Sequence, residues 1–376
     1  MKIGIFQIVT LSLILVCSLL NTLAFSASPT PTLLKAKQEA EAKGYIFFTN
    51  HDEILSKAKQ EGKLRVVAGV TRSAQATTEA FRKKYPFIDI QAETLSGIGD
   101  AQKLLLEIKG GAAKDWDIVR PPTGYHTELA PYLLKVDILG MVEQGVLEIP
   151  RPMIDPKNRN FVALLTRFHV FAYNKNLVAP SQLPKSWEDL LRPEWKGRKF
   201  AIDVNPLEVA ALVPAWGLEK TLDYARKIAA QQPIWIQGSS ARVLTTVGAG
   251  ETPAYFGPNY GGVKGYQQKD PLGVLQYVIL EPVPLRITIE QGILATARNP
   301  HAALLWLEFM AGAEAQKLID QHEPLVASVY SKDSAAERAL RGKKLSVISW
   351  DNNAVVDQWM GKIVEAYGFP NASTTK

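Results

Sequence analysis

The sequence predicts an α/β protein built as two lobes, with extended runs that cross from one lobe to the other. The first observation is the unit at residues 63–100, where an apolar run, a helix-spaced stretch, a second extended run and a glycine-rich loop follow in order. This order is typical of a parallel sheet covered by helices. The second observation is that the same alternation returns over residues 199–262. The third is the run at residues 161–175, in which both alternating rows are mostly apolar. At about 3.3 Å per residue it extends for roughly 45 Å, which suits a strand that passes between lobes.

Composition places the chain among ordinary globular proteins. It has 376 residues, of which 47% are hydrophobic and 21% charged, so two domains with sizeable cores are expected. The net charge of +6 is spread along the chain, without a Lys or Arg run typical of nucleic-acid binding. We therefore expect no nucleic-acid partner, and we expect a monomer.

The N-terminal residues 1–26 predict a secretory signal peptide. Lys2 precedes an apolar run at residues 3–20, and small residues follow, so cleavage is expected between Leu23 and Ser28. The apolar length also permits an uncleaved membrane anchor. The only cysteine is Cys17, which lies inside this run and follows a valine rather than a small residue, so we expect no lipidation. The mature chain would then have no disulfide.

The remaining chain divides into a helical preface at residues 27–62, a first lobe at 63–165 and 285–320, and a second lobe at 166–284 and 321–376. Strands are expected at residues 64–70, 87–92, 116–119, 199–204, 233–237 and 253–256, with extended runs at 161–175, 275–284 and 286–297. Helices are expected at residues 33–43, 51–62, 74–85, 101–109, 186–191, 207–216, 221–230, 241–247, 302–319 and 354–367. The helix at 302–319 is expected to be a single amphipathic one.

Candidate ligand-binding residues lie where the predicted strands end, because ligands of open α/β sheets bind beyond the carboxyl ends of the strands. These residues are Thr71, Arg72, Ser73, Ser96, Gly97, Arg120, Asp203, Ser239, Ser240, Arg242 and Tyr260. Most supply hydroxyls, backbone amides at helix starts or guanidinium groups, all of which favour a small organic anion, with a carboxylate as the first choice. Asp203 argues for a cation or a sugar hydroxyl instead. In the alternative interpretation Ser239 only caps its helix and Arg242 faces solvent. We interpret Arg167 and His169, within the long run, as structural.

Catalytic and cofactor motifs are missing from the sequence. We find no Gly-x-Ser-x-Gly elbow, no His-x-x-x-His pair and no phosphate loop ending in Gly-Lys-Ser/Thr. Gly97 and Gly99 begin a dinucleotide fingerprint, but Gln102 stands where its third glycine belongs. We therefore expect neither an enzyme nor a cofactor.

Five stretches in the same order resemble the substrate-binding proteins of bacterial ABC importers, of the family-1 extracellular, ferric-ion-binding type. They are ILSKAKQEGKLRVVAG (54–69), AYNKNLV (172–178), LPKSWEDLLRPEWKGRKFAID (183–203), GAGETPA (248–254) and GILATARNPHAALLWLEFMAGA (292–313). The resemblance implies the type II periplasmic binding protein fold, with the ligand cleft between lobes that crossing strands join. It also implies a periplasmic receptor that delivers a small molecule to an inner-membrane ABC permease.

The iron ligands of that family are only partly present. Its iron binders carry a His after the first strand, where Thr71 stands here, and a Glu after the third strand, where Arg120 stands. Their adjacent Tyr-Tyr pair is reduced to Tyr260 followed by Gly261. No metal site is therefore assigned. A ferric or other metal receptor of the same fold remains the alternative, and an enzyme on this two-lobed fold is a more distant one.

Overall fold

A computed structural model describes residues 29–68, 71–95, 98–121, 125–238, 240–323, 326–352 and 354–369. Within them the strands join in the order β2-β1-β3-β9-β4-β7-β5-β6, while β10 pairs with β9 and β8 pairs with β4. The strands are β1 (Lys63–Val67), β2 (Asp89–Glu93), β3 (Ile118–Val119), β4 (Phe161–Asn174), β5 (Ala201–Asp203), β6 (Ile234–Ile236), β7 (Ala254–Asn259), β8 (Leu275–Val278), β9 (Val283–Ile293) and β10 (Leu345–Ile348). The predicted signal peptide lies outside the described residues.

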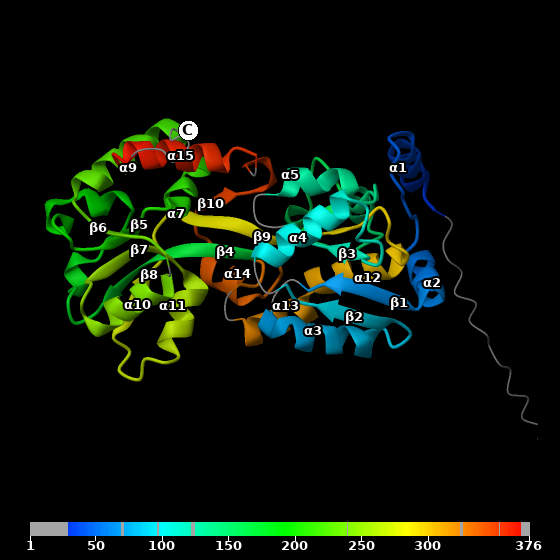
Figure 1. The fold of residues 1–376 in the computed structure, drawn as a ribbon, viewed down its shortest axis with the longest axis horizontal. Helices are drawn as coiled ribbons and strands as arrows, with labels where there is room; N and C mark the ends of the chain where they lie inside the picture. Colours follow the sequence, from blue (N-terminus) through cyan, green and yellow to red (C-terminus); the bar gives the residue numbers. More distant parts are fainter. Residues whose placement is uncertain are drawn as a thin grey trace, which may run out of the picture.

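The strands form two groups, and β4 and β9 run between them (Figure 1). We call the part around β1, β2 and β3 the first lobe and the part around β5, β6, β7 and β8 the second lobe. Strand β4 pairs with β9 from Phe161 to Phe168 and then changes partners to β7 and β8. The predicted crossing strand is therefore confirmed. The lobe boundaries given above stay a prediction.

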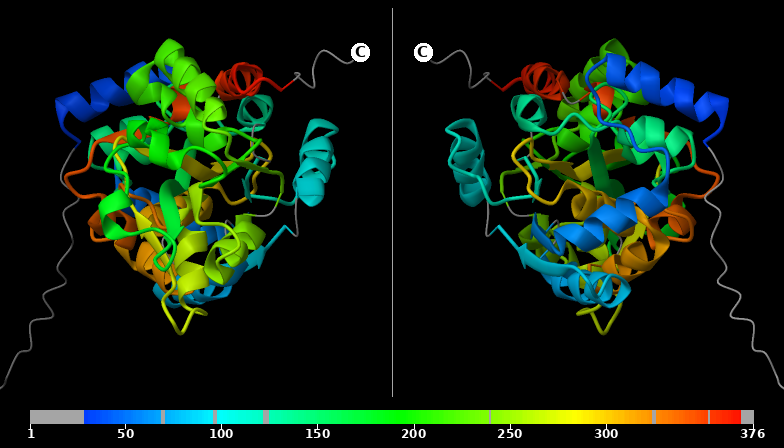
Figure 2. Two further views of the ribbon diagram at one scale, coloured as in Figure 1. Left: turned by 90° about the vertical axis from the view of Figure 1, so that its left-hand side faces the viewer. Right: turned by 90° about the vertical axis from the view of Figure 1, so that its right-hand side faces the viewer.

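Helices pack on both faces of the sheet. In the first lobe they are α1 (Pro31–Ala42), α2 (His51–Glu61), α3 (Thr71–Lys84), α4 (Ile98–Lys109), α5 (His126–Leu129), α6 (Ile138–Glu143), α12 (Pro300–Ala311) and α13 (Ala313–His322). In the second lobe they are α7 (Leu207–Ala210), α8 (Val213–Trp216), α9 (Leu218–Ala230), α10 (Ser240–Ala249), α11 (Tyr260–Gln267), α14 (Ala335–Leu340) and α15 (Val356–Ala366). Helices α9 and α15 lie on one face of the second lobe and α10 and α11 on the other (Figures 1 and 2). None of the helices in the described ranges is both long and apolar enough to cross a membrane.

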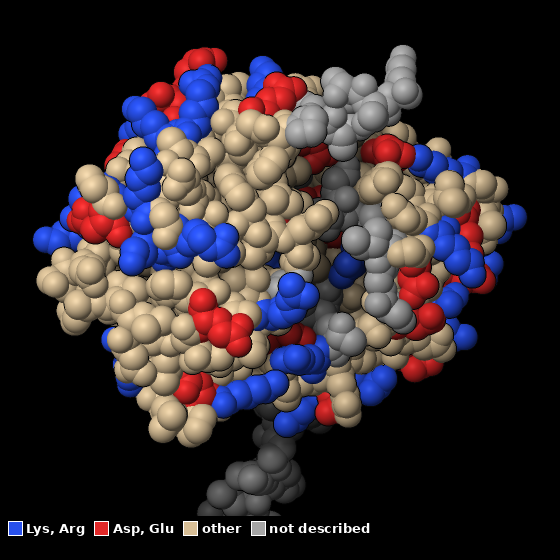
Figure 3. Space-filling model, turned by 60° about the vertical axis from the view of Figure 1, so that its left-hand side comes forward, with Lys and Arg blue, Asp and Glu red and all other residues tan. Residues whose placement is uncertain are grey.

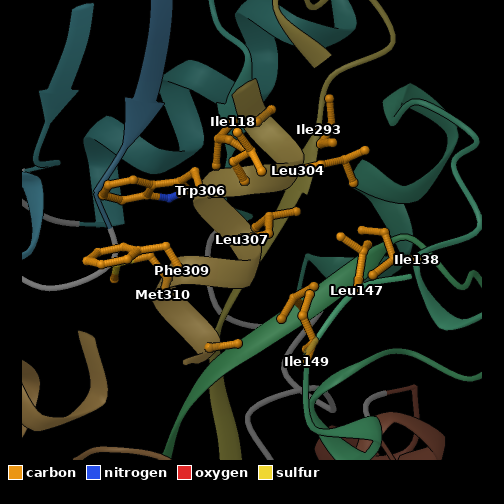
Figure 4. Close-up of a cluster of buried hydrophobic side chains, with 14 of the residues drawn as sticks. Ile118, Ile138, Leu147, Ile149, Ile293, Leu304, Trp306, Leu307, Phe309 and Met310 are labelled. Carbon is orange, nitrogen blue, oxygen red and sulfur yellow. The ribbon is translucent and has the colours of Figure 1, made fainter. Parts of the chain in front are cut away.

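The first lobe is organised around α12, and here the prediction of one long amphipathic helix was wrong. The chain breaks at Gly312, whose extended ψ of 161° ends α12 before α13 begins. Helix α12 is buried on nearly all sides rather than along one stripe. Trp306 and Phe309 point to one side of it, and Leu307 points to the other, toward Leu147 (Figure 4). An apolar helix buried all round has no polar face, so a search for amphipathic periodicity misjudges it.

Smaller differences concern short elements. The helix predicted at residues 207–216 is two short helices, α7 and α8, and the one predicted at 186–191 is a 3₁₀ turn. In that turn the capping is as predicted, because Asp189 Oδ2 accepts hydrogen bonds from the backbone of Lys185 and Ser186. Strand β10 and helix α11 were not predicted.

Candidate functional site

A cavity of about 370 Å³ lies where the two lobes meet the crossing strands. Its walls are Arg120, Pro121, His126 and Thr127 of the first lobe, Arg167 and residues 286–290 of the crossing strands, and Asn205, Leu207, Ile348, Val356, Asp357 and Met360 of the second lobe. Both basic and acidic side chains lie along a groove between the two halves in the space-filling view (Figure 3). The cavity is therefore polar and charged on the side of the crossing strands. Where β10 and α15 contribute, it is mostly apolar apart from Asp357.

Two arginines face each other across the crossing strands. Arg167 of β4 lies directly opposite Arg286 of β9 in the antiparallel register. Residues in such a pair share one face of the sheet, with Cβ atoms about 5 Å apart, and like charges there are destabilising. Glu323 raises the pKa of Arg167 and Glu290 that of Arg286, but burial outweighs both effects, and Arg167 Nε is buried without a hydrogen-bond partner.

Arg120 brings a third guanidinium to the same cavity from the residue after β3. Burial, followed by the repulsion from Arg167, lowers the pKa of Arg120 and of Arg286, and burial also lowers the pKa of Arg167. An arginine side chain nevertheless stays protonated in a protein. The three side chains therefore hold like charges close together in a partly desolvated place, which favours an anion between them.

The strand that carries Arg286 departs from regular geometry beside the cavity. Ile289 has φ 56°, in the left-handed region that β-branched residues rarely adopt. Residues 286–290 contribute consecutively to the cavity wall, whereas side chains of a regular strand alternate between faces. Arg286, Thr288 and Glu290 share one face of the strand, so the irregular backbone is needed only for Ile287 and Ile289 to contribute to the same wall. Strained backbone of this kind is concentrated at functional sites.

A second charged cluster, centred on His126, lines the same cavity. His126 Nδ1 lies 2.9 Å from Glu290 Oε2, and Nε2 lies 3.0 Å from Asp155 Oδ2. Burial lowers the pKa of His126, but the hydrogen bonds to Asp155 and Glu290 outweigh it and raise the pKa to about 9. The ring also stacks on Phe161, with centroids 4.2 Å apart. This imidazolium is thus neutralised from both sides.

The structure places one sequence-predicted site residue, Arg120, in the cavity wall. Arg72 and Arg242 are exposed, Ser73 is buried in α3, Ser240 begins α10, and Asp203 at the end of β5 accepts a hydrogen bond from Asn205 N; none of these five lines the cavity. Ser96, Gly97 and Ser239 lie outside the described residues, as does the side chain of Thr71. The ligand-binding roles of these residues stay predictions.

Tyr260 lies apart from the cavity. Its side chain is buried, and its hydroxyl lies 3.1 Å from that of Tyr277. Burial, together with the bond to Tyr277, raises the pKa of Tyr260, so that its phenolate form is disfavoured. In the part of the chain that the structure describes, no group of three or more His, Cys, Asp or Glu side chains is arranged to hold a metal ion.

Sequence reasoning missed Arg167, Arg286, His126 and Glu290. Arg167 was interpreted as structural; it lines the cavity, and its role stays a prediction. The interpretation holds for His169, which is buried, donates from Nδ1 to Gly257 O at 2.7 Å and has its pKa lowered to about 4 by burial. The register of the two crossing strands was the missing information, because only the register shows that two arginines more than a hundred residues apart are neighbours.

Two lobes joined by crossing strands, with a charged cavity at their junction, define the class of solute receptors that hold a ligand between lobes. Residues 140–354 match the bacterial extracellular solute-binding protein family, and the chain belongs to that family. Its relatives are solute-binding proteins, so the chain is a binding protein and not an enzyme. The predicted resemblance to ferric-ion-binding substrate-binding proteins of ABC importers is confirmed.

Two characterised relatives are similar in sequence. The chain is 24% identical over 237 residues to the Fe(3+)-binding periplasmic protein of Serratia marcescens, covering 60% of this chain and 68% of that protein. It is 27% identical over 215 residues to iron uptake protein A1 of Synechocystis sp., covering 52% of this chain and 58% of that protein.

Solved structures show the same fold. Apo ferric ion-binding protein A of Pasteurella haemolytica has a TM-score of 0.61 at 18% identity, covering 83% of this chain and 99% of that one. The Trichodesmium protein IdiA (FutA), in complex with iron and citrate, has a TM-score of 0.61 at 19% identity, covering 82% of this chain and 100% of that one. The predicted two-lobed α/β fold is therefore confirmed.

Proposed function

We propose that this protein is the periplasmic receptor of an ABC importer, that it captures a small organic anion between its lobes, and that it delivers this anion to an inner-membrane permease. The observation that carries the proposal is the group of Arg120, Arg167 and Arg286 in the cavity wall. A carboxylate between guanidinium groups accepts short, charge-assisted hydrogen bonds, often two from one arginine. It also offsets the repulsion between Arg167 and Arg286.

The mechanism is hinge closure, with no bond-making step. The bend is expected near residues 166–171 of β4 and 281–286 of β9. In support, β4 changes its pairing partners in this region, and its register with β7 shifts between His169 and Phe171. Small-angle scattering should give a smaller radius of gyration with a saturating ligand than without it. An unchanged radius at saturation would contradict hinge closure.

The test of the ligand class is a calorimetric binding screen of carboxylates, sugars, amines and metal ions. We expect an organic anion to be the tightest binder and Arg120→Ala to weaken its binding. At 100 times its dissociation constant this anion should stabilise the folded protein by about 2.7 kcal/mol. Arg242→Ala removes an exposed arginine that lies outside the cavity. Weaker binding in this variant would favour the strand-end residues predicted from the sequence as the ligand site, and unchanged binding would favour the cavity. A neutral or cationic best ligand would contradict the proposal.

A second candidate is a receptor for ferric ion, and the names of the relatives favour it, since they are an Fe(3+)-binding protein and an iron uptake protein. The neighbour that holds iron together with citrate suggests how iron and three arginines are compatible, because a ferric complex whose organic ligands bring more than three negative charges is an anion. Ferric ion alone, citrate alone and ferric citrate should be titrated separately. A visible tyrosinate band with ferric ion, lost in Tyr260→Phe, would support direct metal binding instead.

A further inference from the structure

We infer that the charged group of the bound anion is a doubly charged tetrahedral oxyanion, as in a phosphate monoester or a phosphonate. We also infer that the organic part of this ligand packs against β10 and α15. The inference rests on the proposed function and specifies its ligand. The tetrahedral group would lie among Arg120, Arg167 and Arg286, and the organic part beside Ile348, Val356 and Met360.

The number and origin of the hydrogen-bond donors point to the tetrahedral group. The three guanidiniums come from three strands or their ends, β3, β4 and β9, so they approach the cavity from different directions. Each guanidinium carries five N–H donors, whereas a carboxylate offers two oxygens with about four acceptor positions in one plane. A phosphoryl group offers three strong acceptor oxygens pointing in three directions. Thr127 and Asn205 add further donors to the same wall.

The charges of the cavity wall agree with this assignment. Glu290 is already hydrogen-bonded to His126, whose other nitrogen bonds to Asp155. Asp357 also lines the cavity, but it projects from α15 and is exposed. Glu323 and Glu290 act on Arg167 and Arg286 respectively, yet the pKa of each arginine stays lowered, and a dianion adds to the compensation of these facing charges.

The opposite wall is mostly apolar, with Asp357 as its one charged residue among those that line the cavity, and it belongs to the C-terminal segment. Ile348 ends β10, and Val356 and Met360 lie one turn apart on α15, where they contact the cavity together with Leu207. This wall offers no donors from its side chains to a bare inorganic ion but buries carbon atoms favourably. The two walls together select an organic anion over free phosphate.

The test is calorimetry on the full mature chain at pH 7.5, where a phosphate monoester is close to doubly charged. The probes are two matched pairs, phenyl phosphate with benzoate and glycerol 3-phosphate with glycerate, plus inorganic phosphate. We expect a phosphate monoester to bind at least about tenfold more tightly than its carboxylate partner and than inorganic phosphate. Arg167→Met should reduce phosphate binding more than carboxylate binding, whereas Arg226→Met, on the exposed side of α9, should change neither.

Each result has a distinct meaning. If the carboxylates bind as tightly as the phosphates, the tetrahedral assignment is overturned while the anion receptor of the proposed function stands. Inorganic phosphate binding as tightly as both monoesters overturns the role of the apolar wall. If no probe binds at millimolar concentration while a sugar, an amine or ferric ion does, both the inference and the proposed function fail. Thermal melts of Arg167→Met and Arg167→Lys verify folding. The lysine variant should recover only part of the affinity, because it keeps the positive charge but not the planar guanidinium that donates two hydrogen bonds at once.

Discussion

Two charged clusters share strand β9 and line one cavity, yet they differ in how their charges are balanced. Around Glu290, the imidazolium of His126 lies between two carboxylates at hydrogen-bond distance. Around Arg286, four residues earlier, the neighbour across the sheet is a second arginine. The first cluster has more negative than positive charge, with two carboxylates around one cation. In the second cluster the guanidinium groups outnumber Glu290, the carboxylate that acts on Arg286, so an anionic ligand adds to the compensation. Removing one partner from a buried, hydrogen-bonded charge cluster destabilises the fold, whereas like charges gathered in a cavity mark a candidate ligand site.

The largest effect should come from the cluster around His126. His126→Gln leaves Asp155 and Glu290 without the cation between them, and we expect a loss of about 3 kcal/mol in the free energy of unfolding at pH 6. Chemical denaturation of the wild type and the variant measures it. Phe161→Leu removes the ring beside His126 and some core packing but leaves both carboxylates in place; as the matched control it should lower stability without changing its pH dependence.

The pH dependence of this effect has a definite sign. The folded-state pKa of His126 is raised to about 9, above its ordinary value of 6.5. The stabilisation is therefore fully present below pH 6.5 and is lost as the pH rises through 9. The difference in stability between wild type and His126→Gln should shrink over that window. A constant difference from pH 6 to pH 9 would mean that His126 is neutral in the folded protein.

The next effect concerns binding at the repelling pair. Arg286→Met keeps much of the side-chain length and removes the guanidinium, so we expect about 2 kcal/mol of lost affinity for the anion, roughly 30-fold. Calorimetry at fixed salt measures this change. Unaltered affinity in Arg286→Met, with Arg226→Met as the surface control, would remove Arg286 from the site.

The smallest effect is a gain in stability. It has the opposite sign to the effect expected for His126→Gln, so it distinguishes the two clusters directly. Without ligand, Arg167→Met removes a like-charge pair across β4 and β9, so the unliganded variant should be more stable than the wild type by about 0.5 kcal/mol. Thermal melts at low ionic strength, repeated at high salt, should show this gain and its reduction by screening. A destabilised unliganded variant would indicate that Arg167 is a structural residue.

The sequence was sufficient for the fold because each strand and helix carries its pattern locally. The long apolar run of β4 and the strand–helix unit that begins at β1 needed no tertiary information. Buried α12 was misjudged because its apolar residues surround it completely. Most residues of the candidate site could not be predicted from the sequence, since Arg167 and Arg286 become neighbours only through strand register. His126 likewise meets Asp155 and Glu290 only in the folded chain.

The most direct test is a crystal structure of the protein with the tightest-binding anion from the screen. The charged oxygens of the anion are expected within hydrogen-bond distance of the guanidinium groups of Arg120, Arg167 and Arg286, while His126 keeps its two carboxylate partners. An anion bound instead beside Ser240 and Arg242, or a ferric ion bound by Tyr260, would contradict it.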